Sequence, residues 1–328
     1  MTNIAVSRLV QIIDRFSNYS LLVVGDLMVD AYLYGKVNRI SPEGPVMVME
    51  VDYEDWKPGG SANVAGNIKA LGARVHIAGL VGADPHGENL SQSLKDAGIG
   101  VAGVITDSSR PTTRKTRIVA QNQQVLRIDR EVKSPASEII GNDLFESISH
   151  TLQDVDAILV SDYQKGAISE RIARKLVPLG KSSSKPVMAN LKPESCMWLE
   201  GADVVTLNQS EAEQLRLALS LNDKDMQNWG AAMRSILNIS LLVITLGSKG
   251  LAFWTETDHQ TVRSHAVEVS DVAGAGDSFV SALTMALLAG ASPLEAATIA
   301  NIAGACAVRK HGVVTVAREE LLIHIHDI

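Results

Sequence analysis

The sequence predicts an α/β fold in which helices flank a doubly wound, mostly parallel sheet, with a small second β-sheet as a lid. Short apolar runs bounded by turn residues recur along the chain, as is typical of strands buried on both faces of a parallel sheet. Helical patterns separate most of these runs, which indicates βαβ units. Two stretches rich in β-branched residues interrupt this alternation and supply the lid.

The expected elements follow one another in a regular order. Residues 6–16 carry apolar side chains at helical spacing, and the run SLLVVGD predicts the first strand. Further strands are expected at 75–81, 157–160, 186–189, 203–206 and 241–245. Helices are expected between them at 61–71, 87–97, 169–179, 211–217 and 226–237. A helix within 278–291 comes next, and Ser292 and Pro293 then open the last one as N-cap and first residue.

The two interrupting stretches lie at about 31–56 and 101–132, and they combine turn signals with little helical periodicity. Both follow directly on sheet elements, so we expect them to form the strands of the lid. A lid of this kind shuts water out of a site and completes it. Residues 1–328 are therefore expected to form a single α/β domain with lid strands inserted.

Composition excludes several classes of function. Apolar residues make up 46% of the chain, enough for a sizeable core. A net charge of −7 and an aromatic content of 4% argue against nucleic-acid binding. No apolar run approaches the ~20 residues that span a bilayer, and the N-terminus lacks a cleavage site for a signal peptide. With only Cys196 and Cys306 there is no disulfide framework, and we expect a cytoplasmic protein without membrane or nucleic-acid partners.

A glycine-led helix start is the first candidate for chemistry. Gly274, Ala275 and Gly276 precede Asp277, and the free N–H groups of such a helix start stabilise anions, phosphates above all. Asp277 can act there as a general base for a hydroxyl. As a plain acidic residue in the first turn it would contribute only ~0.3–1 kcal/mol through the helix dipole. The spacing alone leaves both interpretations open.

A second glycine turn, in KPGGSANVAGN, opens another predicted helix. It has neither the Gly-Lys-Ser/Thr ending of a P-loop nor the position of a dinucleotide fingerprint. Gly59 and Gly60 would let a polyhydroxylated ligand approach the backbone, with Asn63 bonding its hydroxyls, although a structural turn explains the pattern equally well. Asp26 and Asp30 follow the first strand, where open α/β sheets bind ligands; the alternative for each is a turn residue.

Five segments, in this order, resemble the signatures of the ribokinase, or PfkB, family of sugar kinases: GDLMVD, PGGSANVAGNIKALG, TLNQSEAE, TLGSKG and DVAGAGDSF. The resemblance runs from about residue 20 to 316. Within the family, ISPEGPV, RIVAQNQQVLRID and SDYQKGA are similar to the D-glycero-D-manno-heptose 7-phosphate kinases of ADP-heptose synthesis. Bifunctional relatives add a nucleotidyltransferase domain with a His-x-x-His motif. Because the chain reaches Ile328 without one, we expect a monofunctional kinase or an isolated kinase domain.

The resemblance implies ATP-dependent phosphorylation of heptose 7-phosphate at O1, giving the 1,7-bisphosphate, with Mg²⁺ and room for a monovalent cation. It makes Asp277 the catalytic base and Gly274, Ala275 and Gly276 the anion hole. The positions that hold sugar hydroxyls are Asp30, Gly59, Gly60 and Asn63. The positions on the nucleotide side are Lys192, Asn208, Glu211, Thr245, Gly247 and Gly250, with Glu211 organising Mg²⁺ through water. A homodimer formed through the lid is also implied.

A phosphorylated substrate is also indicated by charge. Residues 110–133 carry seven basic residues against two acidic ones, a local charge of +5, so the rest of the chain carries −12. Lys115 and Arg117 share one face of a predicted strand, which suits an anionic sugar phosphate. An edge strand protected by charge is the alternative. Gln124 and Arg127 match the heptose-kinase pattern, and Asp162 at a strand end is a better substrate candidate than Tyr163 or Lys165 nearby.

Other functions remain to be weighed. A kinase for another sugar or sugar phosphate would differ in its hydroxyl contacts. A nicotinamide oxidoreductase would suit the sheet, but no G-x-G-x-x-G follows the first strand. A non-catalytic sugar-binding regulator is disfavoured by the intact Asp277. The chain also departs from the usual pattern, because Asn190 stands where heptose kinases carry Asp and Ala273 replaces a threonine.

Overall fold

A nine-stranded sheet forms the centre of the molecule in the computed structural model, which describes residues 4–121, 123–264 and 267–327. Its strands are β1 (Ser20–Gly25), β4 (Arg74–Gly82), β5 (Gly100–Asp107), β8 (Ala157–Ser161), β9 (Val187–Asn190), β10 (Val204–Asn208), β11 (Leu241–Thr245), β12 (Leu251–Trp254) and β13 (His259–Val262). Their order is β13-β12-β11-β10-β9-β8-β1-β4-β5. All neighbours pair in parallel except β11–β12 and β12–β13.

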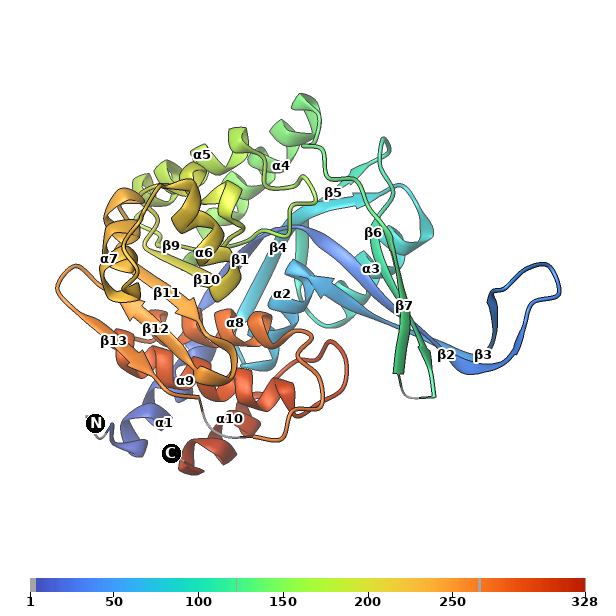
Figure 1. Cartoon of the computed structure of the whole chain (residues 1–328). Helices are drawn as coiled ribbons and strands as arrows, with labels where there is room; N and C mark the ends of the chain where they lie inside the picture. The colour runs from blue at the N-terminus through green and yellow to red at the C-terminus, as the bar shows by residue number, and fades with distance from the viewer. Residues whose placement is uncertain (1–3, 122, 265–266, 328) are drawn as a thin grey trace.

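Helices cover both faces of this sheet (Figure 1). One face carries α1 (Val6–Asp14), α2 (Ser61–Ala70), α3 (Pro85–Asp96), α8 (Ala275–Leu288), α9 (Pro293–Val308) and α10 (Arg318–His324). The other carries α4 (Glu138–Thr151), α5 (Glu170–Ser182), α6 (Gln209–Ala218) and α7 (Met226–Ile236). Short 3₁₀ turns are η1 (Phe16–Asn18), η2 (Leu152–Asp154), η3 (Pro193–Leu199), η4 (Gly247–Lys249) and η5 (Ile325–Asp327). Within β1, Leu21 and Val23 enter one core and Leu22 and Val24 the other.

The lid is a four-stranded sheet that projects from the main body, to the right in Figure 1. It consists of β2 (Leu27–Ile40), β3 (Met47–Gly60), β6 (Thr113–Ala120) and β7 (Gln123–Arg130), in the order β3-β2-β6-β7. β2 pairs antiparallel with β3 and parallel with β6, and β6 pairs antiparallel with β7. Only Asp26 separates β2 from β1, so the chain passes directly from the central sheet into the lid.

The α/β class with a separate small sheet is confirmed, but the expected boundaries need correction. The stretch 101–132 is not all lid, because β5 pairs with β4 at the edge of the central sheet. As an edge strand β5 is only partly buried, and its mixed composition therefore resembled that of the lid strands. The lid also starts earlier than residue 31, at Leu27. Further elements were not expected: the helices α4, although Leu144 and Ile148 lie one helical turn apart on its buried face, and α10, and the antiparallel pair β12–β13.

The described helices include none that is both long enough and apolar enough to cross a membrane.

Candidate active site

Asp277 lies in the first turn of α8, at the end of the molecule where β1 passes into the lid. Gly274 caps this helix with a left-handed backbone (φ +77°), which glycine adopts without strain. A side chain added at Gly276 would meet nothing within 4 Å, so the backbone there is open to a ligand. Gly274, Ala275 and Gly276, which are predicted to form an anion hole, thus lie at the N-terminus of α8, where the Ala275 N–H donates to the Val272 carbonyl at 3.3 Å.

Both carboxylate oxygens of Asp277 accept hydrogen bonds. Asn63 of α2 donates its Nδ2–H to Oδ2 at 2.7 Å, and the hydroxyl of Tyr163 donates to Oδ1. Desolvation by the surrounding protein raises the pKa of Asp277 to about 6, against the lowering effect of these two donors. A carboxylate with a pKa close to neutrality is well matched to the task of a general base.

The position of Asn63 is fixed by the packing of α2 against α8. Asn67, one turn further along α2, accepts hydrogen bonds at Oδ1 from the Ser278 hydroxyl at 2.8 Å and from the Val316 N–H at 3.0 Å. It also donates to the Asn63 carbonyl at 2.9 Å. The α2 helix is thus tied to the start of α8, and the Asn63 amide is held facing the candidate base.

Asp30 of β2 is nearly fully buried and forms an ion pair with Arg117 of β6. The Arg117 guanidinium lies 5.3 Å from the ring centroid of Tyr32, a cation–π arrangement. Gly59 leaves the space for the Asp30 carboxylate, because a Cβ there would lie 1.9 Å from Oδ2. Gly60 adopts φ +57° against the Asp26 carbonyl. Arg117, which was predicted to bind the substrate phosphate, thus forms an ion pair with Asp30, which was predicted to bind sugar hydroxyls.

Two further basic residues of the lid, Lys115 and Arg127, pair with Asp129. Lys115 lies beside Asp30 in strand register and 3.9 Å from Asp129 of β7. Arg127 donates to the same Asp129 carboxylate at 2.9 Å, and burial lowers the pKa of Lys115. Gln124 is exposed on β7. Lys115 is therefore the predicted basic residue that lies nearest in register to Asp30.

Asp162 is buried, and its contacts are internal. Its Oδ1 accepts the Gln164 N–H at 2.7 Å, and its Oδ2 accepts the Ser195 hydroxyl. The structure thus places this predicted substrate residue inside the β8–α5 loop, where it holds the backbone. Tyr163, which had been set below it, is the residue of the motif that reaches Asp277.

A cavity of about 510 Å³ lies beside the anion hole, a size suited to a nucleotide. It is lined by five of the predicted residues: Thr245, Gly247, Gly250, Ala275 and Gly276. Phe279, Val308 and Asn301 supply an apolar wall and one amide that the sequence analysis did not identify. Asn301 donates to the Arg263 carbonyl at 2.7 Å, which joins α9 to the segment after β13. Phe279 lies inside α8, and Asn301 and Val308 lie inside α9, so no local sequence pattern marked these three residues as ligand-binding.

Asn208 and Glu211 form the capping box that begins α6. Asn208 Oδ1 accepts the Glu211 N–H at 2.9 Å, and Glu211 Oε2 accepts the Asn208 N–H at 2.8 Å. The other oxygen of Glu211 pairs with Lys192. Asn190 accepts a hydrogen bond from Thr206 at 3.1 Å. Glu211 therefore carries its negative charge next to a lysine, and both its oxygens already have partners.

Within the described part of the chain, no cluster of three or more His, Cys, Asp or Glu side chains could hold a metal ion by itself. Mg²⁺ in phosphoryl-transfer enzymes is bound through one or two carboxylates plus the substrate's phosphates, with several waters retained. Glu211, which pairs with Lys192 and accepts the Asn208 N–H, is the carboxylate that the resemblance assigns to this role, through water.

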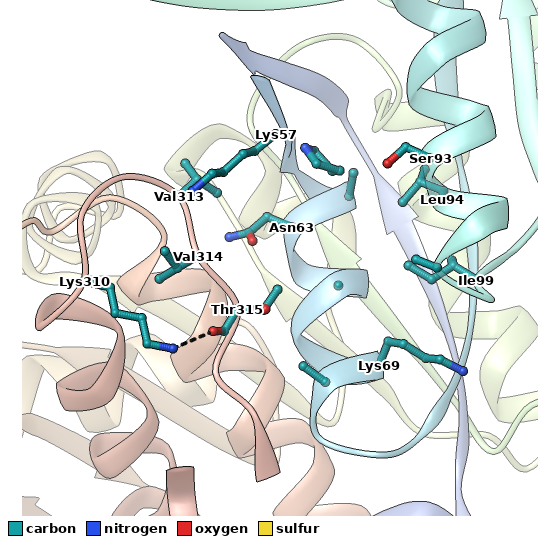
Figure 2. Close-up of a pocket in the computed structure, with 15 residues that line it drawn as sticks. Lys57, Asn63, Lys69, Ser93, Leu94, Ile99, Lys310, Val313, Val314 and Thr315 are labelled. Atoms are coloured by element: carbon teal, nitrogen blue, oxygen red, sulfur yellow. Dashed lines mark hydrogen bonds between the residues drawn. The ribbon is translucent and has the colours of Figure 1, made fainter. Parts of the chain in front are cut away.

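Asn63 also borders a second cavity, of about 550 Å³, between α2, α3 and residues 310–315 (Figure 2). Lys57, Lys69 and Lys310 lie around it. Lys310 donates to the Thr315 carbonyl at 3.1 Å and pairs with Glu320. The same segment is attached to the lid, because the Val313 N–H donates to the Tyr32 hydroxyl at 3.1 Å.

Several known proteins are similar to this chain in sequence or in fold. The model of the pfkB family of carbohydrate kinases matches residues 18–320. The chain is 38% identical over 307 residues to a protein of Helicobacter hepaticus named bifunctional protein HldE, covering 93% of this chain but 64% of that protein's length. Among solved structures, Arabidopsis thaliana ribokinase complexed with ribose and ATP superposes with a TM-score of 0.72 at 20% identity. The match covers 94% of this chain and 98% of that chain. Phosphofructokinase-2 of Escherichia coli in complex with potassium gives 0.75 at 18% identity, covering 94% and 99%.

Proposed function

Because this chain belongs to the pfkB family of carbohydrate kinases, we propose that it transfers the γ-phosphoryl group of ATP to O1 of D-glycero-D-manno-heptose 7-phosphate. The product would be the 1,7-bisphosphate, formed for ADP-heptose synthesis in the cytoplasm. The observation that carries the proposal is the placement of Asp277, a carboxylate with a raised pKa, at an open helix N-terminus that faces the lid's Asp30 and Lys115 side.

The reaction requires alignment and charge stabilisation more than covalent chemistry from the protein. Asp277 takes the proton of the acceptor hydroxyl, the hydroxyl oxygen attacks the γ-phosphorus, and ADP leaves. The N–H groups of Gly274 and Gly276 would face the transferring phosphoryl group and stabilise its charge, while the Ala275 N–H donates to the Val272 carbonyl at 3.3 Å. Asn63 keeps one carboxylate oxygen of the base in place.

The sugar would lie between α2 and the lid. Asp30, fixed by Arg117, and the backbone at Gly59 and Gly60 would bind its hydroxyl groups. Lys115 and, further along the lid, Arg127 would attract the distal phosphate, with Gln124 as a polar neighbour. Their present partner, Asp129, shows that these cations are held close together before a substrate arrives.

The nucleotide would occupy the cavity lined by Thr245, Gly247 and Gly250, with the adenine against its apolar wall. Lys192, Asn208 and Glu211 lie on the phosphate side, and Mg²⁺ held there through water would neutralise charge on the nucleotide phosphates. A monovalent cation could also bind to the protein, since the similar phosphofructokinase-2 structure contains potassium.

We also propose that a second copy of the chain covers the outer face of the lid. Large apolar side chains are exposed there, with Trp56 at 39%, Leu126 at 53% and Ile128 at 50%. Trp56 and Ile128 lie in one register row, on the two outer strands of the lid, with Ala31 and Thr116 between them. Sedimentation should give a dimer at micromolar concentration, and Leu126→Asp should give a monomer; a monomeric parent protein would refute this part.

The substrate assignment is tested by measuring ADP release from MgATP against a panel of sugars and sugar phosphates. Turnover confined to heptose 7-phosphate, with phosphorus NMR placing the new phosphate at O1, is the expected result. Turnover only with another sugar would keep the kinase and reject this substrate. Sugar binding without turnover by any member of the panel would reject the kinase assignment in favour of a regulator.

A further inference from the structure

The proposed reaction leaves three buried or half-buried groups in or beside the loop between β8 and α5, residues 162–169, without a role: Asp26, Asp162 and Tyr163. Asp26 comes directly after β1 and is 2% exposed, and Asp162 is 1% exposed. Tyr163 follows Asp162 in the chain, and its hydroxyl donates to Asp277.

Asp26 binds this loop through three backbone hydrogen bonds. Its Oδ2 accepts the N–H groups of Tyr163 at 2.8 Å and Lys165 at 3.0 Å, and its Oδ1 accepts that of Ala167 at 3.0 Å. Such an arrangement of N–H groups around one carboxylate stabilises the ionised form of Asp26, although burial and the nearby Asp162 raise its pKa to about 6.

Asp162 supports the same loop from the other side. It accepts the Gln164 N–H and the Ser195 hydroxyl, so it joins the loop to η3. Gln164 has φ +57° and Gly166 φ +88°, both in the left-handed region. For Gln164 this conformation has a cost, which persists only where surrounding contacts over-determine it. The loop is therefore held in a conformation that the chain would not adopt by itself.

These contacts of the loop fix the direction of the Tyr163 side chain. With its backbone N–H held by Asp26, Tyr163 extends to Asp277 and donates its hydroxyl proton to Oδ1. Burial raises the pKa of Tyr163 well above its usual value, so the hydroxyl stays protonated and acts as a donor. The other oxygen of Asp277 is held by Asn63, so the carboxylate plane is fixed at both ends.

We propose that Asp26, Asp162 and Tyr163 form a positioning frame, in which Tyr163 orients the Asp277 carboxylate toward the acceptor hydroxyl. This inference rests on the proposed function only in naming Asp277 as the base. A carboxylate oxygen has two lone pairs, so Asp277 still has acceptor capacity for the substrate after Tyr163 and Asn63 are satisfied. Tyr163 is thus a positioning residue: it acts on the substrate through Asp277.

The frame makes a prediction about pH that packing alone does not. Losing a donor to the ionised form raises the pKa of a carboxyl group. The groups that face Asp277 are Tyr163 and Asn63, the carboxylate of Asp30 on β2, and the ammonium of Lys192 after β9. Only the Tyr163 donor is removed in Tyr163→Phe, so the acid limb of the activity profile should move to higher pH.

The test compares Tyr163→Phe with Tyr19→Phe, which removes a hydroxyl from a partly buried tyrosine packed against the core far from Asp277. For Tyr163→Phe we expect kcat to fall by about tenfold, KM for both substrates to change less than about twofold, and the acid limb to rise by ~0.5–1 pH unit. Tyr19→Phe should leave all three unchanged. Ser195→Ala, which removes a donor to Asp162, should shift the limb in the same direction by less.

A second measurement needs no turnover. The ¹³C shift of the Asp277 carboxyl group, assigned with Asp277→Asn, is titrated in the ligand-free protein. A higher pKa in Tyr163→Phe supports the frame even if no sugar on the panel is phosphorylated, which separates its outcome from that of the proposed function. An unchanged carboxyl pKa, or a lower kcat with an unmoved acid limb, would reduce Tyr163 to a packing residue and overturn the inference.

Discussion

The two sides of the site are built differently. At the junction of α2 and α8, the contacts Asn63–Asp277 and Asn67–Ser278 join residues more than 200 positions apart, and they are largely enclosed by helices. On the lid, Lys115, Arg127 and Asp129 pair within one hairpin and remain partly exposed. The junction is thus held by contacts between distant segments, whereas these three lid charges are held within one hairpin. In the proposed reaction the junction would carry the chemistry, and the lid would recognise the substrate.

Removing the base should have the largest effect. Asp277→Asn keeps the shape of the side chain but cannot accept the proton, so kcat should fall by roughly 10²–10⁴-fold. KM for the sugar phosphate should change little, because the lid is untouched. The measurement is steady-state ADP release. A loss confined to KM would mean that Asp277 binds the sugar and that the division between the two sides is wrong.

The pH dependence of kcat should reflect the ionisation of Asp277 at the junction of α2 and α8. Asp277 must be ionised to act as the base, and its pKa lies at about 6. Activity should therefore fall about tenfold per pH unit below that value and reach a plateau above pH 7. Since a phosphate monoester also titrates near pH 6, the profile is recorded at saturating substrate. A kcat that stays level down to pH 5 would contradict the raised pKa.

A smaller and more selective effect is expected on the lid. Lys115→Ala removes a cation from the row that contains Asp30, so KM for heptose 7-phosphate should rise by about tenfold while kcat changes less than about twofold. Binding of the same sugar without its phosphate should be unaffected. Lys36→Ala, at an exposed position of β2, is the matched control. Equal losses for both sugars would show that Lys115 supports the fold of the lid.

The smallest effect concerns stability. The pKa of Asp277 is raised from 3.8 to about 6 in the folded protein, so its stabilising contribution is complete below pH 3.8 and is lost as pH rises through 6. An amide does not titrate, so Asp277→Asn should gain stability relative to the parent between pH 4.5 and 7.5. The gain should be on the order of 1 kcal/mol, read from urea unfolding. A difference that does not vary with pH would contradict this assignment.

The sequence predicted the junction better than the loop that supports it. Asp277, Asn63 and Asp30 lie in local patterns, a glycine-led helix start or a strand end, whose chemistry can be read from neighbouring residues. Tyr163 reaches its partner only because Asp26, far away along the chain, holds its backbone. Asp162 was expected to face the substrate and instead binds the loop, since a strand-end carboxylate can serve either purpose.

The fold shows the same division. The buried parallel strands were predicted from their apolar runs, and β5 was assigned to the wrong sheet because edge strands of both sheets are partly exposed. The Arg117–Asp30 pair also depended on tertiary structure: the basic strand was identified, but the sequence does not show that Arg117 pairs with Asp30 although Lys115 lies opposite Asp30 in the register.

The direct passage from β1 into β2 has a mechanical consequence. The chain enters the lid at Asp26 and leaves β3 directly into α2, so neither of these connections is a flexible loop. Asp26 also accepts the Tyr163 N–H, and the Tyr163 hydroxyl donates to Asp277. A substitution at Asp26 would therefore act on the attachment of the lid and on the candidate base together.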